Sequence, residues 1–242
     1  MCSSDLSVRD AFTRIADTAE RLVAPQGGDV LTLQVYSTFT IRWLIPRLKA
    51  FEARHPQLKL RLVTSQWDVD FSRDDVDACI AIGHPNYTDL HYTYLFSSEV
   101  FPVASPAFLA RHPLHLPEDL CRAPLLQVHP SRSDWQVWLD RAQVAGVDPD
   151  DGLAFDSYDH ALATARQGLG VALAMEIYAA DELASGALVE PFAPLRAAHP
   201  GAWWFVCRRE QVTLPKVRAL REWLLDEVTA DDRLTRRPEA SP

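Results

Sequence analysis

The chain has 242 residues, a length that accommodates one or two domains with a substantial core. Hydrophobic residues make up 48% of the chain and charged residues 24%, which are ordinary values for a globular protein in water. The net charge of −9 argues against a free-standing nucleic-acid-binding fragment, because such fragments are usually basic.

The N-terminus and the cysteines favour a reducing compartment. Residues 7–23 mix apolar and charged side chains, which is typical of a surface helix and unlike the apolar core of a secretory signal. Cys79 and Cys207 lie inside apolar runs, so we expect buried free thiols instead of a zinc or redox site. No apolar run approaches the ~20 residues of a membrane span. We therefore expect a cytoplasmic protein with no membrane partner.

Residues 31–51 join a strand to a helix. Apolar and polar side chains alternate up to Tyr36, which predicts a strand. Pro46 then favours a turn over residues 38–43 and a regular helix over 46–54. The connecting turn offers cap hydroxyls and free N–H donors to a ligand, although an ordinary capped connection is equally compatible with it. The apolar stripe of the helix should cover its own sheet: Ile41, Leu44, Ile45, Leu48 and Phe51.

Strand and helix patterns alternate along the rest of the chain. This order predicts an α/β protein with parallel sheets covered by helices. The run 91–104 is too long for one strand, and we interpret it as a strand that leaves one sheet and enters a second. The tail from Asp231 is polar and is expected to be disordered. The other predicted strands are 58–64, 78–82, 125–128, 153–155, 171–174 and 203–208, and the last helix is 216–229.

The sequence lacks the common catalytic and phosphate-binding motifs. There is no G-x-S-x-G, H-E-x-x-H, G-x-x-x-x-G-K or G-x-G-x-x-G pattern. His112 and His115 could share a metal ion, but two solvated histidines are the simpler interpretation. The acidic run 68–77 has the polarity of a solvated loop, not of a tuned acid–base pair. We expect no enzyme activity, no metal and no cofactor.

An ordered set of motifs resembles the effector-binding domain of LysR-type transcriptional regulators, in the branch that includes GcvA and AmpR. Each motif is weakly specific, but their order over residues 29–226 is strong. The segment RDAFTRIADTAERL resembles the end of the family's linker helix, so the chain looks like a regulator without its winged helix-turn-helix. The motifs are STFTIRWLIPRLKAFEARHPQLKLRL, DDVDACIAIG, WQVWLDRAQVAG, FDSYDHALATARQGLGVAL, DELASGALVEPF and WWFVCRR.

The resemblance implies two Rossmann-like subdomains joined by two crossing strands, as in periplasmic solute-binding proteins. Subdomain I would comprise residues 29–98 and 205–230, and subdomain II residues 99–204. Residues 1–28 would hold the end of the linker helix and a linker, and residues 231–242 a disordered tail. The chain crossings would fall near 97–101 and 202–206.

The resemblance also implies a ligand in the cleft between the subdomains, at the carboxyl ends of strands. Two turns that cap helices and the ends of two strands would supply its contacts, and we expect a small polar or anionic effector. The implied ligand-binding residues are Ser37, Thr38, Phe39, Thr64, Ser65, Gln66, His129, Asp156, Ser157, Tyr158 and Trp203.

The first helix also suggests an interface. Trp43, Arg47 and Ala50 share a face away from the apolar stripe, and an indole beside a cation and a small residue is typical of protein contacts. The resemblance implies a homodimer in which this face meets the helix 159–167 of a second copy, where Ala161 and Ala165 allow close approach. It implies a tetramer for the full-length regulator, and DNA binding only through the missing N-terminal domain.

Two other functions remain open at this stage. A solute-binding protein of a transport system has the same fold, but it would need a signal peptide. An enzyme on the same two-lobed fold would need a convergent set of acid, base and nucleophile. Fold analogy alone does not decide between these classes.

Overall fold

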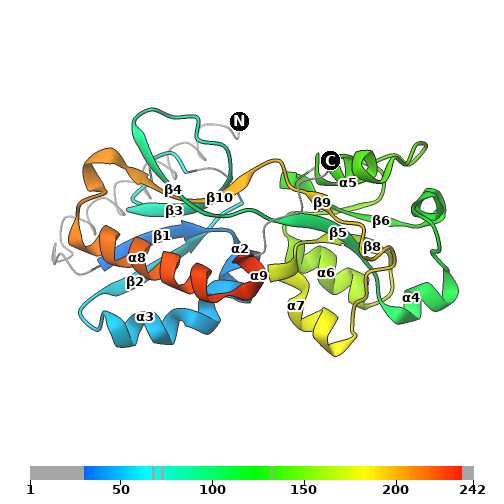
Figure 1. Cartoon of the computed structure of the whole chain (residues 1–242), viewed down its shortest axis with the longest axis horizontal. Helices are drawn as coiled ribbons and strands as arrows, with labels where there is room; N and C mark the ends of the chain where they lie inside the picture. The colour runs from blue at the N-terminus through cyan, green and yellow to red at the C-terminus, as the bar shows by residue number, and fades with distance from the viewer. Residues whose placement is uncertain (1–29, 67–68, 72–73, 132, 236–242) are drawn as a thin grey trace, which may run out of the picture.

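The computed structural model describes residues 30–66, 69–71, 74–131 and 133–235. Two lobes lie side by side, each built on a five-stranded sheet, and two chain segments connect them (Figure 1). The two sheets have the same arrangement: three parallel strands, then one antiparallel strand, then a fifth strand at the edge. The predicted α/β fold, with two subdomains joined by two chain crossings, is confirmed. The predicted linker helix in residues 1–28 lies outside the described residues.

The sheet of lobe I combines three parallel strands with two others. β1 pairs in parallel with β2 and with β3, and β10 runs antiparallel between β3 and β4. Parallel strands that are buried on both faces read as apolar runs, which is the pattern of β3, whereas β1 alternates apolar and polar side chains and still buries Thr32 and Gln34. In sheet order, the strands are β2 (Lys59–Thr64), β1 (Val30–Val35), β3 (Ala78–Gly83), β10 (Ala202–Arg208) and β4 (Leu90–Phe96).

The sheet of lobe II repeats this arrangement. β6 pairs in parallel with β7 and β8, and β5 runs antiparallel to β8 and to the short β9. The predicted run 91–104 divides as expected, since β4 belongs to the first sheet and β5 to the second. In sheet order, the strands are β7 (Leu153–Phe155), β6 (Leu125–Val128), β8 (Val171–Ala174), β5 (Glu99–Val103) and β9 (Ala197–Ala198).

Residues 97–98 and 199–201 form the two crossings between the lobes. The backbone N–H of His199 donates to the carbonyl oxygen of Ser98 at 2.9 Å, so the crossings are bonded to each other. Residues 202–204 already belong to β10 in lobe I, where Trp203 pairs with Ile82 and Phe96. The second crossing therefore comes before Ala202, and the predicted subdomain boundary at 204/205 lies too late in the chain.

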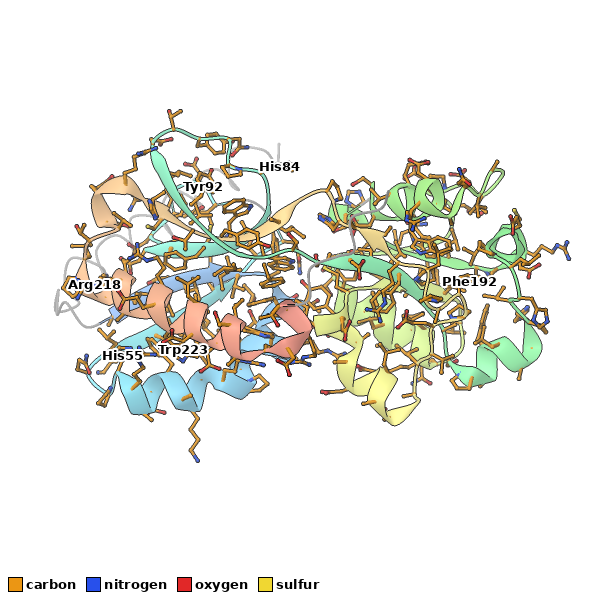
Figure 2. All side chains as sticks on the ribbon, in the orientation of Figure 1. His55, His84, Tyr92, Phe192, Arg218 and Trp223 are labelled. Atoms are coloured by element: carbon orange, nitrogen blue, oxygen red, sulfur yellow. The ribbon has the colours of Figure 1, made fainter. Side chains whose placement is uncertain are left out.

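Helices cover one face of the sheet of lobe I (Figure 1). Trp223 of α8 (Pro215–Ala230) is labelled in Figure 2. Its ring packs on Phe51 of α3 (Leu48–Arg54), with ring centroids 4.9 Å apart. The other face carries a smaller cluster of Phe71, Val76, Cys79 and Val206. Burial raises the pKa of the Cys207 thiol, in the same strand as Val206, to about 11. The predicted buried free thiols Cys79 and Cys207 are confirmed.

The segment after β1 is not one regular helix. It passes through α2 (Ser37–Phe39), a π-helical turn η1 (Thr40–Leu44) and a 3₁₀ turn η2 (Ile45–Arg47) before α3 begins. The π turn holds one extra residue, because the N–H of Ile45 bonds to the carbonyl of Thr40. It rotates the side chains away from an ideal helical register, so Trp43 is fully buried while Ile41 and Ile45 are 54% and 50% exposed. The prediction that Ile41 and Ile45 cover the sheet is wrong.

Helices cover both faces of the sheet of lobe II. In Figure 1, α5 (Ser133–Ala142) lies on one side of the sheet, while α6 (Tyr158–Arg166) and α7 (Glu176–Ser185) lie on the other. Ala161 and Ala165 of α6 are fully buried against this lobe. The short elements of this lobe are α4 (Pro106–Arg111), η3 (Pro117–Arg122) and η4 (His129–Ser131), and η5 (Arg209–Gln211) follows β10 in lobe I.

The first residues of the predicted disordered tail belong to the fold. Asp231 and Leu234 are 8% and 7% exposed, and α9 (Asp232–Thr235) follows α8 directly. Asp231 Oδ2 accepts hydrogen bonds from Trp43 Nε1 at 3.0 Å and from Arg47 at 2.7 Å. These long-range partners explain why a polar sequence is ordered here. Among the helices that the structure describes, none is long and apolar enough to cross a bilayer.

Candidate functional site

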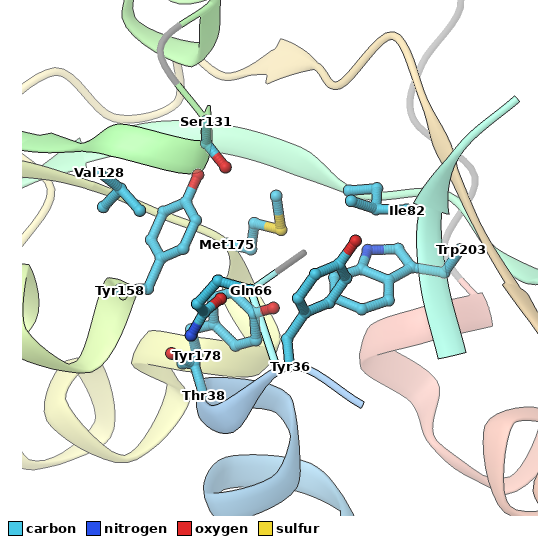
Figure 3. Close-up of a pocket in the computed structure, with 10 residues that line it drawn as sticks. All are labelled: Tyr36, Thr38, Gln66, Ile82, Val128, Ser131, Tyr158, Met175, Tyr178 and Trp203. Carbon is cyan, nitrogen blue, oxygen red and sulfur yellow. The ribbon is translucent and has the colours of Figure 1, made fainter. Parts of the chain in front are cut away.

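A cavity of about 270 Å³ lies between the two lobes (Figure 3). Both lobes contribute to its wall, and nine of its ten lining residues come at or just after the carboxyl ends of parallel strands. This is the edge at which open α/β sheets bind ligands. The lining residues are Tyr36, Thr38, Gln66, Ile82, Val128, Ser131, Tyr158, Met175, Tyr178 and Trp203.

The order of strands brings these residues together. Tyr36 and Thr38 follow β1, Gln66 follows β2, and Ile82 lies near the end of β3, so lobe I supplies three adjacent strand ends. Lobe II supplies the matching ends of β6, β7 and β8. The exception is Trp203, which lies near the start of the antiparallel β10 and closes the cavity at the crossing.

Aromatic rings form one side of the cavity. Trp203 meets Tyr36 and Tyr178 edge-on, with ring centroids 5.9 and 6.2 Å apart. On its other side it stacks on Phe39 and Phe96 at 5.0 and 5.4 Å. Such aromatic contacts hold ring positions more firmly than area burial alone. The cavity wall near the crossing is therefore built from closely packed aromatic rings.

Hydroxyl and amide groups provide the polar part of the wall. Gln66 donates from Nε2 to Ser37 Oγ at 2.7 Å, which orients the amide in the cavity wall. None of the ten described lining residues carries a charged side chain. Burial raises the pKa of Tyr178 well above its ordinary value, as do Tyr36, Asp159 and Asp134 nearby. Its phenol therefore stays neutral and offers a hydrogen-bonding hydroxyl.

A buried carboxylate lies directly behind Tyr158. The Tyr158 hydroxyl donates to Asp134, and burial together with this carboxylate raises the pKa of Tyr158 well above its ordinary value. The other carboxylate oxygen of Asp134 lies 3.4 Å from His199 Nε2. Burial lowers the pKa of His199, but Asp134 and the Gly201 backbone together raise it by more, so the net shift is upward.

The two lobes touch beside the cavity, at Thr38 and Arg42. Thr38 Oγ1 in lobe I accepts a hydrogen bond from the backbone N–H of Asp159 in lobe II at 3.2 Å. Arg42 in lobe I donates to Asp159 at 2.9 Å and to Glu182 at 2.6 Å. Burial lowers the pKa of Arg42, while its bonds to Glu182 and Asp159 raise it by more. This arrangement holds the lobes together around the cavity.

Comparison with known proteins identifies the family. The model of the LysR substrate-binding domain matches residues 25–229. The chain belongs to this family. Among curated relatives, the glycine cleavage system transcriptional activator of Escherichia coli K12 is 32% identical over 93% of this chain and 74% of its own length. The transcriptional activator AmpR of Pseudomonas aeruginosa is 33% identical over 93% of this chain and 74% of its own length.

Solved structures agree with this LysR assignment. The effector domain of Pseudomonas aeruginosa AmpR aligns with a TM-score of 0.75 and 33% identity, covering 85% of this chain and 98% of that domain. The effector-binding domain of Citrobacter freundii AmpR aligns with a TM-score of 0.74 and 27% identity, covering 84% and 100%. The chain is thus the effector-sensing domain of a LysR-type regulator.

Four of the predicted ligand residues of this LysR domain line the cavity: Thr38, Gln66, Tyr158 and Trp203. Ser37 lies beside them through its bond to Gln66. Phe39 is fully buried beneath Trp203, and it is a core residue instead of a lining residue. Its apolar ring faces the sheet because the first turn after β1 is already helical.

The other predicted ligand residues lie outside the lining. Asp156 is exposed and pairs with His160 at 2.8 Å, and the buried Ser157 has its hydroxyl 3.3 Å from the same ring. Ser65 lies at a second, much smaller hollow beside Tyr36. Thr64 and His129 are exposed at the ends of β2 and β6. Ligand contact by these residues stays a prediction.

Sequence reasoning missed six lining residues. Four of them come at the ends of strands that the sequence predicts, so a strict strand-end rule would have found Tyr36, Ile82, Val128 and Met175. Ser131 lies in η4, and Tyr178 lies in the first turn of α7. No local pattern marks which side of that turn faces the cleft.

The predicted dimer face requires correction. Trp43, Ala161 and Ala165 are fully buried within one chain, so they are unavailable to a partner. Arg47 is half-buried and bonds to Asp231, and its guanidinium lies 4.4 Å from the Trp43 ring centroid. Only Ala50 of the predicted set is exposed. The π turn explains the burial of Trp43, since it turns this side chain inward while Ile41 and Ile45 face outward, and Ala161 and Ala165 lie on the face of α6 that packs in the core. Within the described residues, no three His, Cys, Asp or Glu side chains gather as a metal site.

Proposed function

We propose that the cavity between the lobes is the effector site, and that an effector there contacts both lobes at once. The observation that carries this proposal is the shared lining, since Thr38 and Gln66 belong to lobe I while Tyr158 and Tyr178 belong to lobe II. A ligand that bridges two lobes favours the arrangement in which they touch. The domain then reports occupancy to the rest of the regulator as a change in lobe geometry.

The lining indicates the chemistry of this effector. A cavity of about 270 Å³ is near the lower end of the range of about 300–1,000 Å³ for small-molecule sites. The rings of Tyr36, Tyr178 and Trp203 suit an apolar body, while the hydroxyls and Gln66 suit neutral acceptors and donors. Of the two predicted classes, the described lining favours a small polar effector over an anionic one.

A thermal-shift screen of small metabolites tests the site. Binding ligands should raise the melting temperature, and Thr38→Val should weaken each by about 0.5–1.5 kcal/mol, the value of one hydrogen bond. The control is Thr229→Val, because the Thr229 hydroxyl bonds to Leu225 in its own helix, away from the cleft. If both variants bind calorimetrically confirmed ligands like the parent, the effector site lies elsewhere.

We propose a binding role in the cytoplasm and not a catalytic one, as expected for a regulator that acts on DNA. The relatives named as transcriptional activators support this over the transport function. Sequence-specific DNA contact would belong to a part of the regulator outside these 242 residues. A gel-shift assay with this acidic chain alone should show no sequence-specific complex with DNA. Such a complex would contradict the proposal that these residues bind only the effector.

We propose that the domain dimerises through the outward face of the segment after β1. Ile41 and Ile45 are half-exposed there, and adjacent exposed aliphatic side chains are typical of interface cores. Ile41→Asp with Ile45→Asp should shift sedimentation equilibrium toward monomer. The control is Leu116→Asp, which places the same charge on an exposed leucine of lobe II. A parent chain that sediments as a monomer would refute the interface.

A further inference from the structure

Three side chains connect the cavity to the segment that joins the lobes. Tyr158 lines the cavity, and its hydroxyl donates to Oδ2 of Asp134. Oδ1 of the same carboxylate lies 3.4 Å from Nε2 of His199. Asp134 is only 3% exposed, so solvent does not compete for these two contacts. A change at either end is therefore felt through one carboxylate.

His199 lies within the second crossing and holds it in two ways. Its backbone N–H donates to Ser98 in the first crossing at 2.9 Å. Its ring atom Nδ1 lies 2.9 Å from the carbonyl oxygen of Gly201 and 3.0 Å from the amide nitrogen of Gly201. The histidine thus contacts both chain segments that any movement of one lobe against the other must bend.

The proton state of His199 selects between the two bonds at Nδ1. A neutral ring with its proton on Nε2, facing Asp134, has a lone pair on Nδ1 and accepts from the Gly201 N–H. A protonated ring carries hydrogen on both nitrogens, so Nδ1 donates to the Gly201 carbonyl instead. Gly201 has little freedom to absorb this change, because even a Cβ there would lie 2.7 Å from the Gly83 Cα.

We infer that Asp134 and His199 are positioning residues that couple effector contact at Tyr158 to the backbone of the second crossing. This inference rests on the proposed function of the cavity. An effector that bonds to the Tyr158 hydroxyl changes how firmly Tyr158 holds Asp134, and hence how firmly Asp134 holds the imidazolium. By reciprocal linkage, effector affinity then depends on pH.

The groups around His199 determine whether its pKa is raised or lowered. Asp134 from α5 is the charged group against the ring, and the phenol of Tyr158 from α6 lies on the far side of that carboxylate. Backbone groups of residues 98 and 201 bond to His199 on its other side. The upward shift in the pKa of His199 agrees with a ring held by a buried carboxylate.

NMR titration of the isotope-labelled chain tests the coupling without any effector. The His199 ring and the Gly201 amide should titrate with one midpoint in the parent, and His199→Gln should abolish the change at Gly201. Asp134→Asn should lower the His199 pKa. Tyr158→Phe should raise it, because the carboxylate loses a donor and attracts the imidazolium more strongly. The matched control is Tyr178→Phe, which removes another hydroxyl from the same cavity and should leave the midpoint unchanged.

Two results would overturn the inference. One is a His199 pKa that responds to Tyr158→Phe and Tyr178→Phe equally or to neither, and the other is a Gly201 amide that does not follow His199. If Asp134→Asn fails to fold, the comparison of the two tyrosine variants still decides. The titration is independent of the metabolite screen, so failure of the effector site and failure of the coupling give different results.

Discussion

Two buried ionic clusters flank the cavity, and they differ in how completely their carboxylates are used. Asp134 directs one oxygen to Tyr158 and the other to His199, so both have partners. At the contact between the lobes, Asp159 and Glu182 share Arg42, and the second oxygen of each is buried without a protein hydrogen-bond partner. The Arg42 cluster, defined by these three residues, spans the lobes, whereas the Asp134 cluster reaches only the crossing.

This difference indicates that the Arg42 cluster holds the two lobes together, whereas Asp134 acts within lobe II and on the second crossing. Arg42 of lobe I bonds to Asp159 and Glu182 of lobe II, and the Arg166 guanidinium of lobe II also lies 3.8 Å from Glu182, so only the Arg42 bonds are lost when the lobes part. Asp134 is satisfied within lobe II and the crossing, so its contacts survive small lobe movements. The cost of a buried charge depends on its partners, and these two sites should respond differently to mutation.

Arg42→Met is expected to have the largest effect. It removes the Arg42 guanidinium from the buried Glu182 and the half-buried Asp159, and breaking such a pair should lower the free energy of unfolding by about 3 kcal/mol in urea denaturation. Arg54→Met is the control, because the Arg54–Asp226 pair is exposed and such pairs contribute about 0–1 kcal/mol. Equal losses in the two variants would show that Arg42 does not hold the lobes together.

Asp231→Asn extends the comparison to a third carboxylate, and we expect a loss of about 2 kcal/mol in unfolding free energy. Burial raises the pKa of Asp231, but hydrogen bonds from Arg233 and Trp43 lower it by more. A lowered pKa means that the carboxylate contributes stability above its unfolded pKa and loses it as pH falls through its folded pKa. Asp232→Asn, at the exposed neighbour, should be neutral. Indistinguishable denaturation curves for the two variants would contradict the docked C-terminal segment.

His199→Gln should give the smallest and most pH-dependent effect. Because the pKa of His199 is raised in the fold, its protonated form contributes stability below the unfolded pKa and loses it as pH rises through the folded pKa. The free energy of unfolding should therefore be higher in the parent than in the variant, and this difference should be about 1 kcal/mol larger at about pH 5.5 than at about pH 8.5. A difference in unfolding free energy that is constant across this range would contradict an ionic role for the ring.

The sequence predicts the strands well because each one buries a short, continuous or alternating apolar pattern. It predicts the segment after β1 poorly, since helical periodicity assumes 3.6 residues per turn and the π turn over Thr40–Leu44 holds more. The polar Asp231 looks disordered in sequence because its partners Trp43 and Arg47 are 188 and 184 residues away. Local patterns carry no information on such contacts.

The candidate site was predictable to the extent that it depends on strand ends. Thr38, Gln66 and Tyr158 follow predicted strands and lie in the cavity, as parallel topology requires. The positions of Asp134 and His199 depend on how α5 packs beside the second crossing, which no spacing in the sequence reveals. Residues that act through other residues are therefore the hardest to find from sequence.

The hydrogen bond between Ser98 and His199 has a consequence for synthesis and engineering. The chain enters lobe II at Glu99 and leaves it after Ala198, and these ends meet side by side. Lobe II is thus one continuous stretch of chain whose two ends lie beside each other. The sheet of lobe I, by contrast, is complete only after β10 has been synthesised up to residue 208. Lobe II is free to fold first on the ribosome, and it forms a cassette that a homologous scaffold could accept at a single pair of junctions.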